Sequence, residues 1–402
     1  MPGDGRQSSR RLPLKALSDV GTFAEPVAER IRAWGVVGTV PRAAAAALVV
    51  FSILYVLVIA SPPDEFGGGD WRTTNTGSAF DDPSAFLTTV LDGITFAGLL
   101  FIVASGFSLI FGLMRVVNMA HGAFYLLGGY IAYEIQQRMT GSGFGLNPTE
   151  VNSLEWVVPW LVAMLCIGVF GLAVQQLLLR WNQGQDLRQA LITIAVSVIV
   201  ADQVIAHFPR TVPAGTQQFG GNAVSISWPG WTNRLIDLHI GGVSYSLSRL
   251  TMLGLGIAVG LVLFLWLHKT KTGMVIRAGV DDRQMASAIG INIQTTFAIA
   301  FLVGSALAAF GATVGGSQAS IAQGRDGEWL LFSLVVVIIG GMGSLAGAAV
   351  GSVLYGLVFA FAVAYLPTAG NDCCTQYSVV LTFVLMALVL AFRPQGLFGR
   401  AA

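Results

Sequence analysis

The chain has 402 residues, of which 54% are hydrophobic and 11% are charged, and its formal net charge is +1 at pH 7. Soluble domains carry roughly 25% charged residues, so this composition excludes a soluble protein, and the net charge gives no indication of nucleic-acid binding. Apolar runs of about 20 residues, enough to cross a hydrocarbon core of roughly 30 Å, recur along the chain. The composition predicts an all-α polytopic membrane protein with no separate soluble catalytic domain.

The first 42 residues form a basic arm that we expect to be disordered and cytoplasmic. Seven of the Lys and Arg residues occur there, among scattered Pro and Gly. The apolar run at 43–60 is long enough to span a membrane, so we interpret it as an uncleaved transmembrane helix rather than a signal peptide. With the Gly-, Asp- and Pro-rich stretch after it, residues 43–84 are predicted to form an extra helix and an outer loop ahead of the main bundle at 85–402.

Nine further apolar runs predict membrane segments and bring the expected total to about ten, some of them broken or half-depth. They lie at 86–112, 119–135, 156–179, 188–208, 248–268, 295–316, 329–341, 345–366 and 377–392. The run at 329–341 is short for a crossing and ends in three glycines, so we expect a broken or half-depth helix there. With the amino terminus inside, sixteen of the 22 Lys and Arg fall on the inner side, which favours cytoplasmic termini in a multi-pass protein of the cell membrane.

The stretch GLMRVVNMAHG at 112–122 places Arg115, Asn118 and His121 between two apolar runs. Polar side chains are costly in lipid and usually face a cavity or the bundle interior. One interpretation is a broken helix in which free backbone groups, Asn118 and His121 face a translocation path. The alternative is a short inner loop anchored by Arg115, in which Asn118 caps the next helix through its side-chain oxygen and His121 only packs.

Asp202 and Gln203, near the outer end of the segment at 188–208, are two more candidates for a translocation path. The alternative is that each is a helix-end or interhelical hydrogen-bonding group, and the same alternative holds for Asp92 in the segment at 86–112. Small residues four positions apart, such as Gly256 with Gly260, predict close helix packing.

Catalytic and metal-binding motifs are missing from the sequence. No GxxxxGK[ST] phosphate loop, GxSxG elbow or HExxH helix occurs, so we expect neither ATP binding nor catalysis by this chain. The four His are well separated, and of the three Cys only Cys373 and Cys374 are adjacent, so we expect no metal site.

A charged stretch, HKTKTGMVIRAGVDDRQMASAIGI, lies in the loop at 268–294 between two long apolar runs. The residues between Gly273 and Gly290 suit one helix of roughly three to four turns, with Arg277 and Asp281 one turn apart. Its apolar stripe would consist of Met274, Ala278, Met285 and Ile289. The loop is either a docking helix for a partner or a cytoplasmic connector whose charges anchor the flanking helices.

Four stretches, in this order, resemble the permease subunit of branched-chain amino acid ABC importers, the LivH type. They are SGFSLIFGLMRVVNMAHGAFYLLGGY (105–130), TGMVIRAGVDDRQMASAIGI (272–291), GGMGSLAGAAVGSVLYG (340–356) and RPQGLFGR (393–400). The resemblance runs from about 86 to 400 and leaves out the first 84 residues and the Cys373 and Cys374 pair. It implies a transmembrane permease subunit of an ATP-driven importer for branched-chain amino acids or a related small solute, with urea, short amides and small organic acids as alternative substrates.

The resemblance also implies partners and a coupling segment. The expected partners are a second permease subunit, two ATPase subunits that bind ATP and Mg, and an external solute-binding protein, whereas this chain would bind no cofactor. The family's coupling residues correspond here to Gly273, Arg277, Ala278, Asp281, Ala286 and Gly290. This favours the docking interpretation of the charged loop. The alternative function is a secondary transporter or channel that works without an ATPase, although the sequence offers few intramembrane carboxylates for it.

Overall fold

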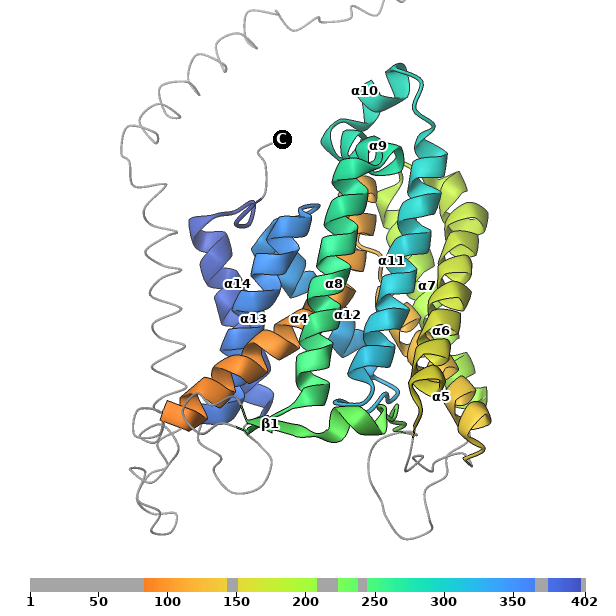
Figure 1. Cartoon of the computed structure of the whole chain (residues 1–402). Helices are drawn as coiled ribbons and strands as arrows, with labels where there is room; N and C mark the ends of the chain where they lie inside the picture. Colours follow the sequence, from red (N-terminus) through yellow and green to blue (C-terminus); the bar gives the residue numbers. More distant parts are fainter. Residues whose placement is uncertain (1–82, 143–150, 208–222, 238–243, 366–374, 399–402) are drawn as a thin grey trace, which may run out of the picture. The chain divides into compact units, whose positions relative to one another are not determined.

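The structure is a computed structural model, and it describes residues 83–142, 151–207, 223–237, 244–365 and 375–398. All of these residues belong to one unit of the chain, and almost all of their regular structure is helical (Figure 1). The elements are α4 (Pro83–Met114), α5 (His121–Thr140), α6 (Ser153–Val174), a π-helical turn η2 (Gln175–Leu179), η3 (Arg180–Asn182), α7 (Asp186–His207), η4 (Gly230–Asn233), β1 (Leu235–Asp237), β2 (Ser244–Ser246), α8 (Leu247–Lys269), α9 (Lys271–Asp281), α10 (Arg283–Ala288), α11 (Ile293–Gly315), α12 (Arg325–Gly340), α13 (Leu345–Tyr365) and α14 (Thr375–Phe392).

Helix α4 is the element against which most of the bundle packs. Glycines along it allow four different neighbours to approach its backbone, and a Cβ atom added at any of them would meet a neighbouring atom within 3.3 Å. The contacts pair Gly93 with α13, Gly98 with α8, Gly106 with α11 and Gly112 with the loop at 341–344. Close approach through small residues is how membrane helices gain packing energy where lipid removes the hydrophobic drive between them.

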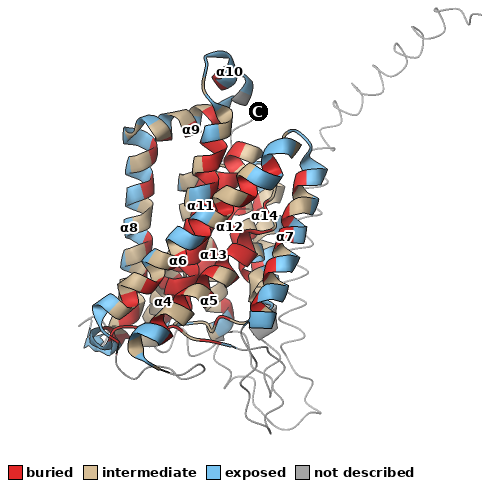
Figure 2. Cartoon of the chain, turned by 90° about the vertical axis from the view of Figure 1, so that its right-hand side faces the viewer, coloured by how far each residue is buried: buried red, intermediate tan, exposed pale blue. Residues whose placement is uncertain are grey.

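Helix α11 forms the densest part of the core. It packs against α4, α5 and α6, and Figure 2 shows buried residues concentrated around it. Gly128 of α5 touches this helix so closely that an added Cβ atom would lie 2.5 Å from the Ala309 Cβ atom. A Cβ atom at Gly168 of α6 would lie 3.2 Å from the Leu302 carbonyl oxygen. Four helices are therefore joined with little free space between them.

Helix α8 is attached to the bundle mainly through α4. Gly256 lies against Gly98, while Leu261 and Val262 on other faces of α8 are more than half exposed. Exposed apolar side chains on a membrane helix contact lipid or another subunit. One side of α8 is thus held by the bundle, and much of the rest is uncovered in the described chain.

A polar cluster fastens α8 to α4 at the end of the bundle that carries the β1–β2 hairpin. Asp92 Oδ1 accepts a hydrogen bond from the Tyr245 hydroxyl, 2.7 Å away, and another from the Arg249 guanidinium. Thr95 Oγ1 lies 3.1 Å from the same Tyr245 oxygen. Burial raises the pKa of Tyr245 to about 12, so the phenol stays protonated at neutral pH and remains a donor. Asp92 is therefore an interhelical hydrogen-bonding group, one of the two roles considered for it.

The nine segments predicted between 86 and 392 each correspond to a helix. By length and composition alone, six of the described helices are suited to crossing a membrane, namely α4, α6 with its continuation through η3, α7, α8, α11 and α13, and α14 is a shorter apolar helix. Helix α5 is not among these six because His, Glu, Arg and two Gln lower its hydropathy, and α12 is not because it has only 16 residues, about 24 Å. The arm at 1–42, the extra helix at 43–60 and the Cys373 and Cys374 pair lie outside the described residues.

Candidate functional site

The chain between α4 and α5 turns back along α4. Helix α4 ends at Met114, yet His121, the first residue of α5, has its Nε2 atom 3.1 Å from the Val103 carbonyl oxygen. Val103 precedes the end of α4 by eleven residues, so α5 begins about 16 Å from that end. The helix is therefore broken within the bundle. Irregular backbone at such depth occurs only where protein or a water-filled cavity surrounds it.

Asn118 and His121 are both buried in this break. Asn118 Oδ1 accepts a hydrogen bond of 3.1 Å from the Ala120 N–H, so the side chain stabilises the turn before α5, although Ala120 is the residue at the N-cap position. The His121 ring packs edge-on against Phe107, with 5.4 Å between ring centroids. Asn118 Nδ2 and His121 Nδ1 are buried without a hydrogen-bond partner. These two path candidates thus lie inside the bundle, next to each other.

Asp202 and Gln203 lie elsewhere, on the exposed surface of α7. On the same helix, Thr193 Oγ1 accepts a hydrogen bond from the Met119 N–H in the α4–α5 break. Nine residues separate Thr193 from Asp202, which is about 14 Å along the helix axis. The structure therefore does not bring the two pairs of path candidates together.

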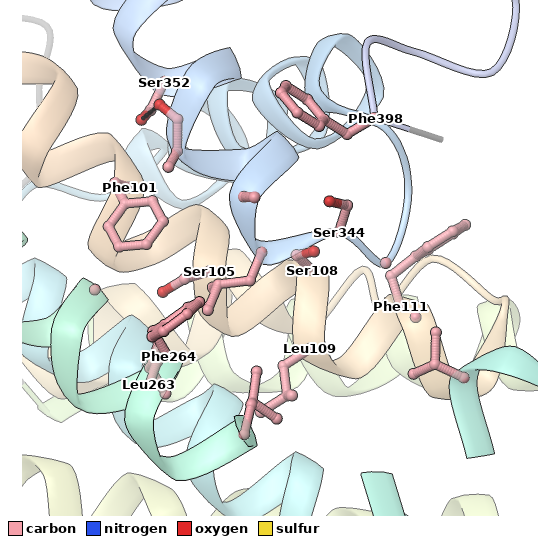
Figure 3. Close-up of a pocket in the computed structure, with 18 of the residues that line it drawn as sticks. Phe101, Ser105, Ser108, Leu109, Phe111, Leu263, Phe264, Ser344, Ser352 and Phe398 are labelled. Carbon is pink, nitrogen blue, oxygen red and sulfur yellow. Dashed lines mark hydrogen bonds between the residues drawn. The ribbon is translucent and has the colours of Figure 1, made fainter. Parts of the chain in front are cut away.

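A cavity of about 1460 Å³ opens between α8 and α13, with α4 as its back wall (Figure 3). Both helices pack on α4, and the described part of the chain shows no extensive contact between them. Helix α9 lines one end through Met274, Arg277, Ala278 and Asp281. Ligand pockets usually measure roughly 300 to 1,000 Å³, so this larger space suits a passage better than a closely fitting pocket.

The walls of this cavity are mostly apolar with a few hydroxyl groups. Phe101 of α4 and Leu263 and Phe264 of α8 contribute rings and aliphatic groups, and Ser344 contributes a hydroxyl (Figure 3). Such a lining offers little to a strongly hydrated ion and more to a small solute with an apolar side chain and a polar end. Within the described residues, no group of three or more His, Cys, Asp or Glu is placed to hold a metal ion.

The charged loop forms two short helices, so the prediction of one continuous helix between Gly273 and Gly290 is wrong. The break falls at Asp282, whose backbone is extended with φ −146° and ψ 104°. Its carboxylate accepts hydrogen bonds of 2.9 Å from the N–H groups of Gln284 and Met285 and so caps α10. Asp282 directly follows Asp281, and the helical periodicity of the sequence continues across both residues. The periodicity therefore did not reveal that Asp282 caps a second helix.

The apolar residues of this loop are largely uncovered. Met274, Met285 and Ile289 are 50%, 61% and 70% exposed, whereas Ile276 of α9 is buried against the bundle. Large apolar side chains that gather on an exposed surface mark an interaction site. The exposed face of α9 and α10 is thus a candidate docking surface.

Gly273 lies at a tight corner between α8 and α9. Thr270 Oγ1 accepts a hydrogen bond of 3.1 Å from the Gly273 N–H and caps α9. A Cβ atom at Gly273 would collide with the Trp266 carbonyl oxygen and the Leu267 backbone. Only glycine fits this corner, which joins the two helices rigidly.

The other coupling candidates have distinct surroundings. Arg277 and Asp281 are exposed at the rim of the cavity, and Ala278 lines it. Ala286 is buried at 2% exposure, so it packs α10 against the rest of the segment. Gly290 has φ +90°, a left-handed conformation that favours glycine.

The four stretches that carry the family resemblance meet at the α9 end of α4. Each of them contributes a residue to backbone or glycine contacts there. Gly112 approaches Gly343, Leu113 approaches Gly279, and the Phe398 N–H donates to the Gly340 carbonyl oxygen at 2.9 Å. The start of the α4–α5 break, the coupling segment and the end of the cavity lined by α9 therefore lie close together.

Sequence reasoning did not identify Phe101, Ser105 or Phe264 as lining residues. Each is an ordinary residue of a membrane segment, and hydropathy does not tell a cavity wall from a lipid-facing side. The spacing of Gly256 and Gly260 was the available signal, and it correctly predicted close packing of α8 on a neighbour.

Comparison with known proteins agrees with the resemblance. A family model described as the permease component of the branched-chain amino acid transport system matches residues 89–390. The high-affinity branched-chain amino acid transport permease protein BraD of Pseudomonas aeruginosa is 26% identical over 317 residues, which is 78% of this chain and 96% of BraD. LivH of Escherichia coli is 25% identical over 317 residues, with the same shares. A probable LivH of Methanocaldococcus jannaschii is 24% identical over 312 residues, 77% of this chain and 92% of the relative.

Among solved structures, PsaBC from Streptococcus pneumoniae in complex with Fab aligns with a TM-score of 0.40 and 11% sequence identity. The alignment covers 75% of this chain and 90% of that chain.

Proposed function

The chain belongs to the family of branched-chain amino acid transport permease components, and from this premise we propose that it moves branched-chain amino acids through a membrane as one subunit of an ATP-driven importer. Substrates of the same general size, such as urea, short amides or small organic acids, are the alternative within this family. Residues 85–402 would be the permease domain, with the extra helix and loop at 43–84 and the basic arm at 1–42 as additions to it.

The observation that carries this proposal is that the cavity and the coupling segment share α9. Met274, Arg277 and Ala278 of this helix line the end of the cavity, and Met274 and Arg277 are exposed as well. A partner that moves α9 therefore changes the end of the cavity directly. This arrangement suits a permease whose opening is driven from outside the chain better than one that works alone.

The positive charges indicate which end of the bundle faces the cytoplasm. Lys269, Lys271 and Arg277 gather at the α9 end, and the positive-inside rule supports our inference that this end faces the cytoplasm. The β1–β2 hairpin end would face outside, where a solute-binding protein delivers its load. Two ATPase subunits, which would bind ATP and Mg, would dock on α9 and α10, and a second permease subunit would complete the passage.

Replacing Arg277 with Glu tests the docking of the ATPase subunits. Charge reversal at the exposed surface of α9 should lower solute-stimulated ATP hydrolysis by the assembled complex about tenfold while membrane insertion stays normal. Arg188→Glu is the matched control, because Arg188 is exposed on α7, outside the docking surface of α9 and α10. Equal hydrolysis by Arg277→Glu and the wild type would contradict docking at α9.

Affinity purification in mild detergent separates the importer from a secondary transporter. The ATP-driven importer predicts that ATPase subunits and a second permease copurify with this chain. Solute flux by the chain alone, in vesicles without ATP, would instead establish the secondary transporter or channel.

A further inference from the structure

We propose that the Phe101 ring, seated against Gly260 of α8, forms with Phe264 a constriction that selects solutes by the bulk of their apolar side chain. This inference rests on the proposed function and adds to it a residue pair that sets the width of the cavity. It makes Phe101 and Gly260 specificity-determining residues of the passage.

The pair is defined by how closely the ring approaches the glycine. A Cβ atom at Gly260 would lie 3.0 Å from Phe101 Cε1, which is tighter than most Cβ contacts, and 3.5 Å from Cζ, an ordinary van der Waals distance. Phe101 is 7% exposed, and both residues line the cavity. The missing side chain of Gly260 therefore provides the space that the ring occupies. A larger residue there would push the ring away from α8.

Phe264, one turn after Gly260, provides the second aromatic wall. Its ring stacks on His268 with 4.2 Å between centroids, and His268 Nδ1 lies 2.9 Å from the Phe264 carbonyl oxygen. These contacts support the orientation of the Phe264 ring. Figure 3 shows Phe101, Ser105 and Phe264 in the same part of the lining.

The two rings form a short apolar stretch of wall, whose width stays set while α8 is packed on α4. Phe101 is confined by its own burial and by the close packing of Gly98 against α8 one turn earlier. An apolar site of set width discriminates by size, and one methylene group changes the preference roughly 10- to 200-fold. A ring displaced from its place at Gly260 should therefore hinder bulky solutes more than small ones.

The test measures uptake of leucine and alanine by the whole importer complex in proteoliposomes supplied with ATP. Gly260→Ala should lower leucine uptake about tenfold and alanine uptake less than about twofold. Gly254→Ala is the matched control on the same helix, because no atom lies within 4 Å of a Cβ atom at that position. The double variant Phe101→Leu with Gly260→Ala should restore leucine uptake, since the smaller side chain fits beside the new methyl group.

The outcomes separate this inference from the proposed function. Leucine uptake by the wild type together with an unchanged leucine-to-alanine ratio in Gly260→Ala would overturn the constriction and leave the importer intact. Uptake of neither amino acid by the wild type would overturn the proposed substrate, and with it the selection by bulk. An electron cryomicroscopy structure of the Gly260→Ala complex checks the cause, because a Phe101 ring in its original place would also overturn the inference.

Discussion

Helices α8 and α11 have 23 residues each and are both apolar enough to cross a membrane, yet they are buried to very different extents. Of an apolar stretch of 18 residues in each helix, 78% is buried in α11 and 22% is buried in α8. Helix α11 packs on three helices, and α8 packs mainly on α4 and continues into α9. The comparison indicates that α11 belongs to a fixed core and that α8 is a wall able to shift.

The cavity lies beside the shifting wall. Its lining comes mainly from α8, α4, α13 and α9, from the loop at 342–344 and from Phe398, and includes no residue of α11. A passage that must change width benefits from one wall with few neighbours, because each contact that breaks on movement costs free energy. The close packing of α11 on α4 keeps α4 in place while α8 is displaced against it.

The largest effect is expected from Gly304→Val in α11. A Cβ atom there would lie 2.7 Å from the Gly106 carbonyl oxygen and 2.7 Å from the Ile110 side chain, with core on every side. Overpacking of a closed core should lower the free energy of unfolding by about 3 kcal/mol or prevent assembly. Thermal unfolding of the purified chain in detergent, with the yield of monodisperse protein, measures this.

Gly256→Val in α8 is the matched variant, because its Cβ atom also meets a carbonyl oxygen, that of Gly98, at 2.7 Å. Since α8 has room to move outward, we expect a loss of only about 1 kcal/mol but a clear fall in solute-stimulated ATP hydrolysis. Equal melting temperatures for the Gly304 and Gly256 variants would refute the contrast between the two helices.

The smallest effect on stability is expected from Asp92→Asn, which removes the charge that holds α8 at the hairpin end. The ion pair with Arg249 is about 40% exposed, so water screens it, and the loss should stay below about 1 kcal/mol. Tyr245→Phe removes the neutral donor, and because the pKa of Tyr245 is about 12, its effect should be the same at pH 6 and pH 9. Melting curves at both pH values measure this, and an effect that differs between them would mean that another group titrates.

The positions of the helices were predictable from sequence, and their depth and contacts were not. Apolar runs predicted α4, α8 and α11 within a few residues because the hydrocarbon core fixes the length of a span. Nothing in the run that begins at 119 shows that α5 starts beside Val103, since that depth depends on how the break folds back on α4. Asp282 shows the same limit, because one extended residue within a helical pattern divided the charged loop in two.

The candidate site was predictable only where charge or glycine marked it. The resemblance located α9 and α10, and the spacing of Gly256 and Gly260 predicted a close helix contact. The side that a phenylalanine or serine faces depends on neighbours distant in sequence, so Phe101 and Ser105 gave no signal. His121 and Asp202 stood out as polar residues, yet the structure buries one and exposes the other.

The cluster of Asp92, Tyr245 and Arg249 ties α8 to α4 at one end, so a movement of α8 would pivot there. A helix of 23 residues is about 34 Å long, so a rotation of roughly 10° about this fixed end displaces the other end by about 6 Å. The displacement is greatest at Gly273, where α9 is attached, and falls to nothing at the hairpin. Such a movement would open the cavity at the α9 end while the hairpin end stays closed.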